Sequence, residues 1–304
     1  MTHRELSRLA ALALALAPAT AGAALRVVTT TEGLAAIARE VGGDRVEVTS
    51  LSRATQDPHF VDANPTLAVK LRDADLLVDV GLDLEVGWLP PLVNQSRNPY
   101  IQPGGSRRLT AASAVPVMDV PSGPVDRSQG DLHPAGNPHF LSDPRQVARV
   151  AEALAGKLAA LDPAGSAAYQ ARLAAFQKRL EADSARWLAA LAPFRGQRVF
   201  TKHRTLTYFA NWSGLVVDGY LEPKPGIEPP PSHLAELVQR ARADKVKAVL
   251  VETYYDARSA AVVSKLSGAR VAMIPGDVGA SPAAATYEGW MDEVVKAVAE
   301  ALRS

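Results

Sequence analysis

Strand-like and helix-like segments alternate along most of this chain, and one long amphipathic helix interrupts the alternation. In the first half, short apolar and β-branched runs lead into helices with N-terminal capping signals, as at Asn64-Pro65. After Pro193 the same alternation resumes. Strands that are separated by helices pair in parallel. The sequence therefore predicts an α/β protein with two lobes, each a parallel-type sheet flanked by helices.

The interrupting helix is expected over residues 164–191. Its apolar residues lie three, four or seven positions apart and form one buried stripe: Tyr169, Leu173, Phe176, Leu180, Trp187 and Leu191. A helix of this length spans roughly 40 Å, more than the width of a small domain. It is predicted to be a rigid strut between a lobe at 24–163 and a lobe at 193–304, with residues 164–192 as the link. An ordinary core helix or a coiled-coil arm would show the same pattern.

Residues 1–23 have the composition of a secretory signal peptide. Arg4 and Arg8 precede an Ala/Leu run that is too short to span a membrane, and Ala21-Gly22-Ala23 offers a cleavage site. Removal of this segment lowers the formal charge from +1 to 0. The remaining chain therefore has no net positive charge that would attract nucleic acid. The chain has no cysteine, so it has neither disulfides nor the residue that carries a bacterial lipid anchor. We expect a free protein in a periplasm.

Two loops share the tripeptide Pro-His-Phe in a chain with only six histidines. His59 lies in the first loop, and His139 lies in the second, within GNPHFLSDP. His203 and Asp277 each lie just past a predicted strand of the second half, where α/β proteins place their sites. Three imidazoles and a carboxylate suit tetrahedral Zn²⁺. Spacing alone does not separate this interpretation from unrelated loop histidines and a turn aspartate.

His133 lies in a segment, residues 119–137, that is rich in proline and glycine and has no periodicity. This pattern predicts a mobile surface loop beside the site. His133 is either an accessory metal-capturing histidine of that loop or a solvated residue.

A resemblance adds to this interpretation. The pieces LRVVTTTEGLAAIAREVGG, QDPHF, KLRDADLLVDVGLDLE, GNPHFLSDP, TKHRTLTYFA, IEPPPSHLAELV, VLVETYYDARSAAVVSKLSGARV and IPGDVG resemble the periplasmic zinc- and manganese-binding proteins of metal ABC importers, the ZnuA/TroA-like solute-binding family. The resemblance implies two lobes joined by one long helix, with the metal in the cleft between them. Carried over residue by residue, it implies the ligands His59, His139, His203 and Asp277.

The resemblance also implies a function. We expect a periplasmic high-affinity receptor that binds Zn²⁺ as its cargo and delivers it to an ABC permease in the inner membrane. It would act as a monomer and not as an enzyme, with a periplasmic metallochaperone as a further candidate partner. Histidine at position 203 favours zinc, since manganese and iron members often have a carboxylate there. The long His-rich loop of many zinc members is absent. The alternatives are a Mn²⁺ or Fe²⁺ receptor of the same fold, a periplasmic zinc hydrolase and a surface adhesin.

Overall fold

Two four-stranded sheets organise the computed structural model, which describes residues 23–123, 130 and 132–303. The predicted signal peptide lies almost wholly outside these residues. All neighbouring strands are parallel, and the strand orders are β2-β1-β3-β4 and β6-β5-β7-β8, so both sheets have the same topology. The strands of the first sheet are β1 (Leu25–Thr29), β2 (Val46–Ser50), β3 (Leu76–Asp79) and β4 (Arg108–Thr110). Those of the second are β5 (Arg198–Thr201), β6 (Val216–Tyr220), β7 (Ala248–Glu252) and β8 (Arg270–Ile274).

Helices cover both faces of each sheet. The first lobe consists of the first sheet with α1 (Glu32–Gly42), α2 (Pro65–Arg72), α3 (Leu89–Ser96) and α4 (Pro144–Leu161). The second lobe consists of the second sheet with α6 (Thr207–Ser213), α7 (Pro231–Ala243), α8 (Arg258–Ser267) and α9 (Tyr287–Leu302). Side-chain caps fix several helix starts: Asn64 accepts from the backbone N–H of Thr66, and Asp143 accepts from that of Arg145.

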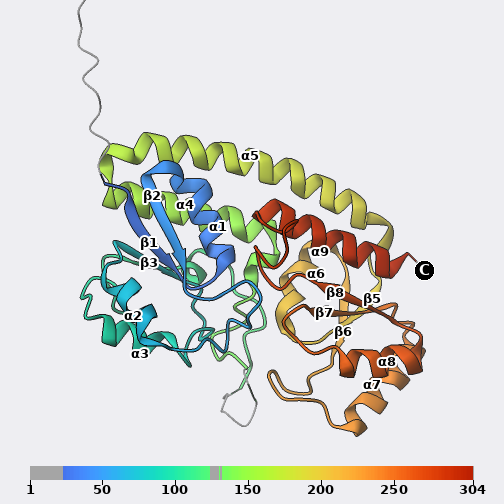
Figure 1. Cartoon of the computed structure of the whole chain (residues 1–304). Helices are drawn as coiled ribbons and strands as arrows, with labels where there is room; N and C mark the ends of the chain where they lie inside the picture. The colour runs from blue at the N-terminus through green and yellow to red at the C-terminus, as the bar shows by residue number, and fades with distance from the viewer. Residues whose placement is uncertain (1–22, 124–129, 131, 304) are drawn as a thin grey trace, which may run out of the picture.

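The long helix α5 (Ser166–Leu191) runs along both lobes (Figure 1). Its buried stripe is the one that the sequence predicts. Tyr169 and Trp187 mark its two ends: the Tyr169 hydroxyl donates to Asp162 at the end of α4, and the Trp187 indole donates to Asp292 on α9. The helix is therefore anchored to both lobes by packing and by hydrogen bonds.

The apolar residues form one central core and two outer cores. Alternate residues of each strand point to opposite faces, so Val27 joins the central core while Val28 joins the core under α2 and α3. In the second sheet Leu250 faces the central core, and Val251 faces the core under α7 and α8. The central core contains residues of both sheets and of α1, α4, α5, α6 and α9. The two lobes therefore share one continuous hydrophobic interior.

The predicted fold class is confirmed: two parallel sheets flanked by helices, with one long helix across them. The exact boundaries between the lobes stay a prediction. The sequence pattern also predicts a helix from Leu82 to Leu92, but helix α3 begins only at Leu89, because Leu82 and Asp83 have positive φ and form a turn. Among the described residues, no helix combines the length and the apolar character that crossing a bilayer requires.

Candidate metal centre

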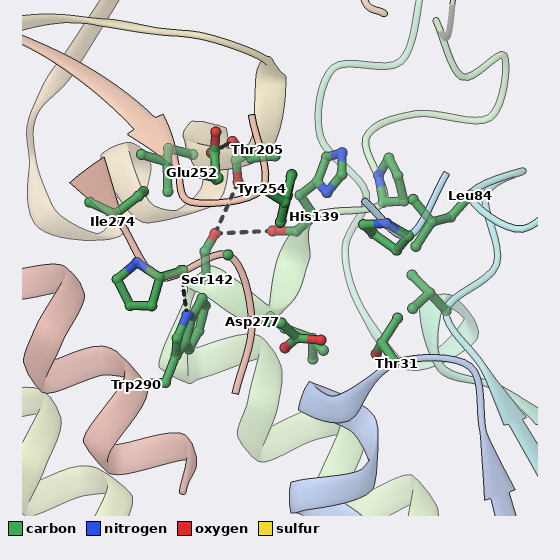
Figure 2. Close-up of a pocket in the computed structure, with 17 residues that line it drawn as sticks. Thr31, Leu84, His139, Ser142, Thr205, Glu252, Tyr254, Ile274, Asp277 and Trp290 are labelled. Carbon is green, nitrogen blue, oxygen red and sulfur yellow. Dashed lines mark hydrogen bonds between the residues drawn. The ribbon is translucent and has the colours of Figure 1, made fainter. Parts of the chain in front are cut away.

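Four loops bring the predicted site residues to the region between the sheets. His59 follows β2, and His139 precedes the short turn that leads into α4. His203 lies two residues past β5, and Asp277 lies three residues past β8. Because parallel strands end at the same edge of a sheet, these loops converge on a common region. A cavity of about 80 Å³ is lined there from both lobes, with Pro58 and His139 on one side and Glu252 and Asp277 on the other (Figure 2).

The three histidines predicted from the sequence lie together. One ring nitrogen of each of His59, His139 and His203 falls within 4.8 Å of the others. Their ring centroids are 5.1 Å (His59–His203), 5.2 Å (His59–His139) and 5.4 Å (His139–His203) apart. Imidazole nitrogens bind zinc at about 2.0–2.1 Å, so ligands of one tetrahedral ion lie roughly 3.4 Å from one another. Small side-chain rotations would bring the three nitrogens to that spacing.

His59 is held by the carboxylate two residues before it. Asp57 accepts hydrogen bonds from the His59 backbone N–H at 2.9 Å and from the ring Nδ1 at 2.7 Å. Burial acts to raise the pKa of Asp57, but the hydrogen bond and charge of His59 outweigh it, and the pKa is lowered. The loop is also fixed to its own lobe, since the Trp88 indole donates to the Pro58 carbonyl. Nδ1 therefore carries the proton, and the lone pair of the ring resides on Nε2, which lies 3.2 Å from His133 Nε2.

His139 presents a buried nitrogen that has no partner. Asn137 Oδ1 accepts from the His139 backbone N–H at 2.9 Å, and this Asx turn fixes the approach of the chain. The His139 Nε2 atom is covered from solvent and makes no hydrogen bond with any residue that the structure describes. Burial, and then the charges of His59 and His203, hold the pKa of this imidazole well below its ordinary value. A histidine binds a metal ion through an unprotonated ring nitrogen. The neutral ring of His139, with its buried Nε2 unpaired, meets this requirement.

His203 is almost fully buried, and Glu222 determines its orientation. The His203 Nδ1 lies 2.8 Å from Glu222 Oε2, which also accepts from the backbone N–H of Gly226. Burial lowers the pKa of His203, although the hydrogen bond to Glu222 acts in the opposite direction. The other nitrogen of His203 therefore faces the cluster.

Asp277 lies in the same cavity but outside the group formed by the three histidines. Its carboxylate accepts from the backbone N–H of Glu32 at 3.1 Å and from that of Val278 at 2.8 Å. It thus lies against the N-terminus of α1, which favours a negative charge. A Cβ atom on Gly33 would lie 2.9 Å from Asp277 Oδ1, so this close approach needs glycine. In Figure 2 the ring of His139 points away from Asp277.

Burial raises the pKa of Asp277 to about 7, and the backbone hydrogen bonds counteract this only in part. The carboxyl group is therefore near its midpoint of ionisation at neutral pH. A bound cation would favour the ionised form.

His133 comes closer to the histidine group than the sequence could indicate. Its Nε2 lies 3.2 Å from the Nε2 of His59, and the two rings stack at 5.3 Å. It also lines a small cavity together with His139 and His203. Burial lowers the pKa of His133 to about 3, with smaller contributions from His59 and His203. Part of the surrounding loop, residues 124–129 and 131, lies outside the described residues.

Sequence reasoning missed the carboxylates that contact the histidines. Asp57 is part of the QDPHF motif, and its place two residues before a histidine was an available signal for an Asx turn. Glu222 is 19 residues from His203, and no short-range pattern connects them. Glu252 was likewise not foreseen: it is buried, accepts from the Thr205 hydroxyl and has one oxygen without a partner. Burial raises its pKa to about 7.

The chain is similar to known metal-binding proteins over most of its length. The family model described as ZnuA, zinc-uptake complex component A, periplasmic, matches residues 27–301. The manganese ABC transporter substrate-binding lipoprotein PsaA of Streptococcus pneumoniae is 27% identical over 246 residues, which are 79% of this chain and 76% of PsaA. The zinc-binding lipoprotein AdcA of Streptococcus pneumoniae serotype 4 is 24% identical over 81% of this chain, which spans only 48% of AdcA.

Solved structures show the same fold. A crystal structure of ZnuA superposes with a TM-score of 0.77 at 26% identity, over 92% of this chain and 99% of that one. The solute-binding protein FpvC of Pseudomonas aeruginosa, in complex with Mn²⁺, gives a TM-score of 0.79 at 25% identity, over 92% and 98% of the two chains.

Proposed function

The chain belongs to the ZnuA family, and from this premise we propose that it is a high-affinity zinc receptor that delivers Zn²⁺ to an ABC-type importer. The broader function follows from the family and the relatives: the chain is an extracytoplasmic, metal-binding substrate-binding protein of an ABC importer, and it is not an enzyme. Zinc as the cargo and the individual ligands are our proposal.

One observation carries the proposal. Three imidazoles from three separate loops each bring a ring nitrogen within 4.8 Å of the others, and the covered Nε2 of His139 has no hydrogen-bond partner among the described residues. Such an arrangement is unfavourable in a protein interior unless an ion completes it. We propose His59, His139 and His203 as the three nitrogen ligands.

The ligand type supports zinc over manganese. Imidazole nitrogens suit zinc, whereas carboxylate and carbonyl oxygens suit Mn²⁺. The alternative is a receptor for Mn²⁺ or Fe²⁺, and it has support as well, because relatives named for manganese and for zinc are about equally similar to this chain. FpvC, which has this fold, has been solved with Mn²⁺ and with Ni²⁺. A deletion variant of ZnuA has been solved with zinc. The cargo must therefore be measured on this protein.

For the fourth position we propose Asp277. It lines the same cavity as His139, and to bind the ion its side chain would have to leave the start of α1, where it accepts from the Glu32 backbone N–H. His133, whose Nε2 is 3.2 Å from that of His59, is the competing candidate and is proposed as an accessory ligand. A hydrolase would leave this position open for water, and nothing in the family supports that role.

We propose that the protein is a free periplasmic monomer that meets an inner-membrane permease and, as a further candidate partner, a metallochaperone. The relatives PsaA and AdcA are named as lipoproteins, which does not agree with the expected lack of an anchor. The sequence contains no cysteine to which a lipid could be attached. Fractionation of cells that express the protein tests this point: recovery in the membrane fraction would overturn the proposal of a free form.

Elemental analysis of the purified protein tests the zinc assignment. We expect one equivalent of zinc in the wild type, retention of zinc against an excess of Mn²⁺, and loss of zinc in His139→Ala. His233→Ala is the matched control, because His233 contacts the Tyr220 carbonyl and is not part of the histidine group. Stoichiometric manganese in place of zinc would select the alternative cargo, and no bound metal would reject the site.

A further inference from the structure

We propose that Glu222 is a positioning residue that fixes which nitrogen of His203 binds the ion, and that Glu222 and Asp57 together supply the negative charge that balances a dication at a site of neutral imidazoles. This inference rests on the proposed function. Neither carboxylate belongs to the group of side chains whose ligand atoms converge. Each instead contacts the outer nitrogen of one converging histidine.

The backbone places Glu222 beside His203. The ladder between β5 and β6 continues past both strands: Leu221 N–H donates to the Thr201 carbonyl at 2.9 Å, and Glu222 N–H donates to the Lys202 carbonyl at 3.2 Å. Glu222 is thus in register with the residue that precedes His203. The first lobe has the same continuation, where Ser52 N–H donates to the Thr30 carbonyl at 3.1 Å. The same backbone hydrogen bond therefore brings a carboxylate, Glu222, beside His203 in the second lobe. In the first lobe it brings Ser52 beside Thr31, where there is no histidine.

The carboxylate of Glu222 is held from several sides. Its Oε2 atom accepts from His203 Nδ1 at 2.8 Å and from Gly226 N–H at 2.8 Å, and its Oε1 atom lies 3.9 Å from the Lys202 ammonium. A carboxylate only accepts, so Nδ1 must donate and the lone pair of His203 resides on Nε2. An acceptor that is fixed in this way selects the tautomer and orients the ring before an ion arrives.

The charges near the site support the second part of the proposal. Lys202 is buried, and its ammonium is 2.9 Å from Glu228 Oε1, so one carboxylate already matches that positive charge. Asp57 and Glu222 remain, each in contact with an imidazole of the converging group. Two negative charges at these positions lie behind two of the nitrogen ligands and would offset the double charge of the ion while Asp277 still contacts the start of α1.

Glu222→Gln is the principal test, with Glu236→Gln as its control. Glutamine is almost isosteric, but it lacks the charge and can donate to Nδ1 as well as accept from it. We expect zinc affinity to fall about 10- to 100-fold in Glu222→Gln, the range observed when groups behind a ligand are changed. Glu236 lies on the exposed face of α7, and its substitution should leave zinc affinity within about 2-fold of the wild type. Asp57→Asn repeats the test at His59 if Glu222→Gln does not fold.

A measurement on the metal-free protein separates positioning from a structural role. The ¹⁵N resonances of the His203 ring should report the Nδ1–H tautomer in the wild type and in Glu236→Gln, and a mixture of tautomers in Glu222→Gln. An unchanged tautomer or unchanged zinc affinity in a folded Glu222→Gln protein would overturn the inference, while zinc binding by the wild type would still support the receptor. A wild-type protein that binds no zinc would instead reject the proposed function on which the inference rests.

Discussion

Glu252 gives a prediction whose size follows from the structure. This glutamate ends β7, is buried, and lines the cavity that also contains His139 and Asp277. The Thr205 hydroxyl donates to one of its oxygens, and the other has no partner. Burial raises its pKa from 4.5 to about 7. The perturbation is Glu252→Gln, which keeps the shape and the acceptor but can never ionise.

The sign and magnitude follow from proton linkage. Between pH 4.5 and about 7 the folded state keeps the Glu252 proton while the unfolded state has lost it, so wild-type stability decreases as pH rises through this range. The full effect is about 3 kcal/mol, and most of it falls between pH 5 and pH 8. Glutamine removes this pH-dependent contribution. The variant should therefore gain roughly 2–3 kcal/mol relative to the wild type between those two pH values.

Urea unfolding of the metal-free proteins at pH 5 and pH 8 measures the difference. Histidine titrations are common to both proteins and cancel in the comparison. A constant offset between variant and wild type is expected from the unpaired amide of glutamine and does not affect the test. Glu236→Gln, on the exposed face of α7, is the control and should show no change with pH. A Glu252→Gln protein whose offset from the wild type is equal at both pH values would refute the reasoning about this buried carboxyl group.

Three further predictions concern the metal. Zinc at about 100 times its dissociation constant should stabilise the wild type by about 2.7 kcal/mol, which for 304 residues raises the melting temperature by about 4 °C; calorimetry should find no such rise in His139→Ala. Zinc titrations between pH 7 and pH 6 should release no proton from His139 or His203, because burial lowers the pKa of both imidazoles, whereas Asp277, with a pKa of about 7, contributes up to one proton per ion; release of three protons would contradict the burial argument. Asp277→Ala should weaken zinc binding more than His133→Ala does, since only Asp277 brings a charge to the ion; competition with a chelator measures both, and the reverse order would assign the fourth position to His133.

The sequence predicted the fold well because its signals are local. Strand and helix patterns, helix caps and the stripe on α5 each depend on neighbouring residues, and parallel pairing follows from their alternation. Two elements, β4 and α6, could not be predicted because they lack such local signals. Strand β4 has only three residues, Arg108–Thr110, and α6 follows so closely on the loop of His203 that the sequence shows no separate helix start.

The candidate site was predictable only in part. His59, His139 and His203 were candidates because histidine is rare in this chain and each follows a turn or a strand end, but only the family resemblance selected them as ligands. The side-chain position of Asp277 could not be chosen, because it depends on the start of α1, which is 245 residues away in sequence. Glu222 depends in the same way on the register of two strands. Contacts of this kind are set by tertiary packing, and a single sequence does not encode them in a short motif.

The loop that contains His139 precedes α4 of the first lobe in sequence, but its hydrogen bonds attach it to the second lobe. The Tyr208 hydroxyl, on α6, accepts from the Met118 backbone N–H and donates to the Asn137 carbonyl, both at 2.9 Å. The Asn137 side chain also donates to the Arg204 carbonyl at 2.8 Å, directly after His203. His139 and His203 are therefore held together by hydrogen bonds that do not involve an ion.

His59 differs, because its loop is fixed to the first lobe by Trp88 and by the contact of its ring with Asp57. Of the three imidazoles, two would move with the second lobe and one with the first. The shared central core opposes any wide separation of the lobes, since it would expose apolar residues of α1, α5 and α9. A small displacement of the His59 loop is sufficient to remove one of three nitrogen donors while the other two stay in place. If the three proposed ligands bind the metal, we expect its release to depend most directly on the His59 side of the site, because that loop alone is fixed to the first lobe.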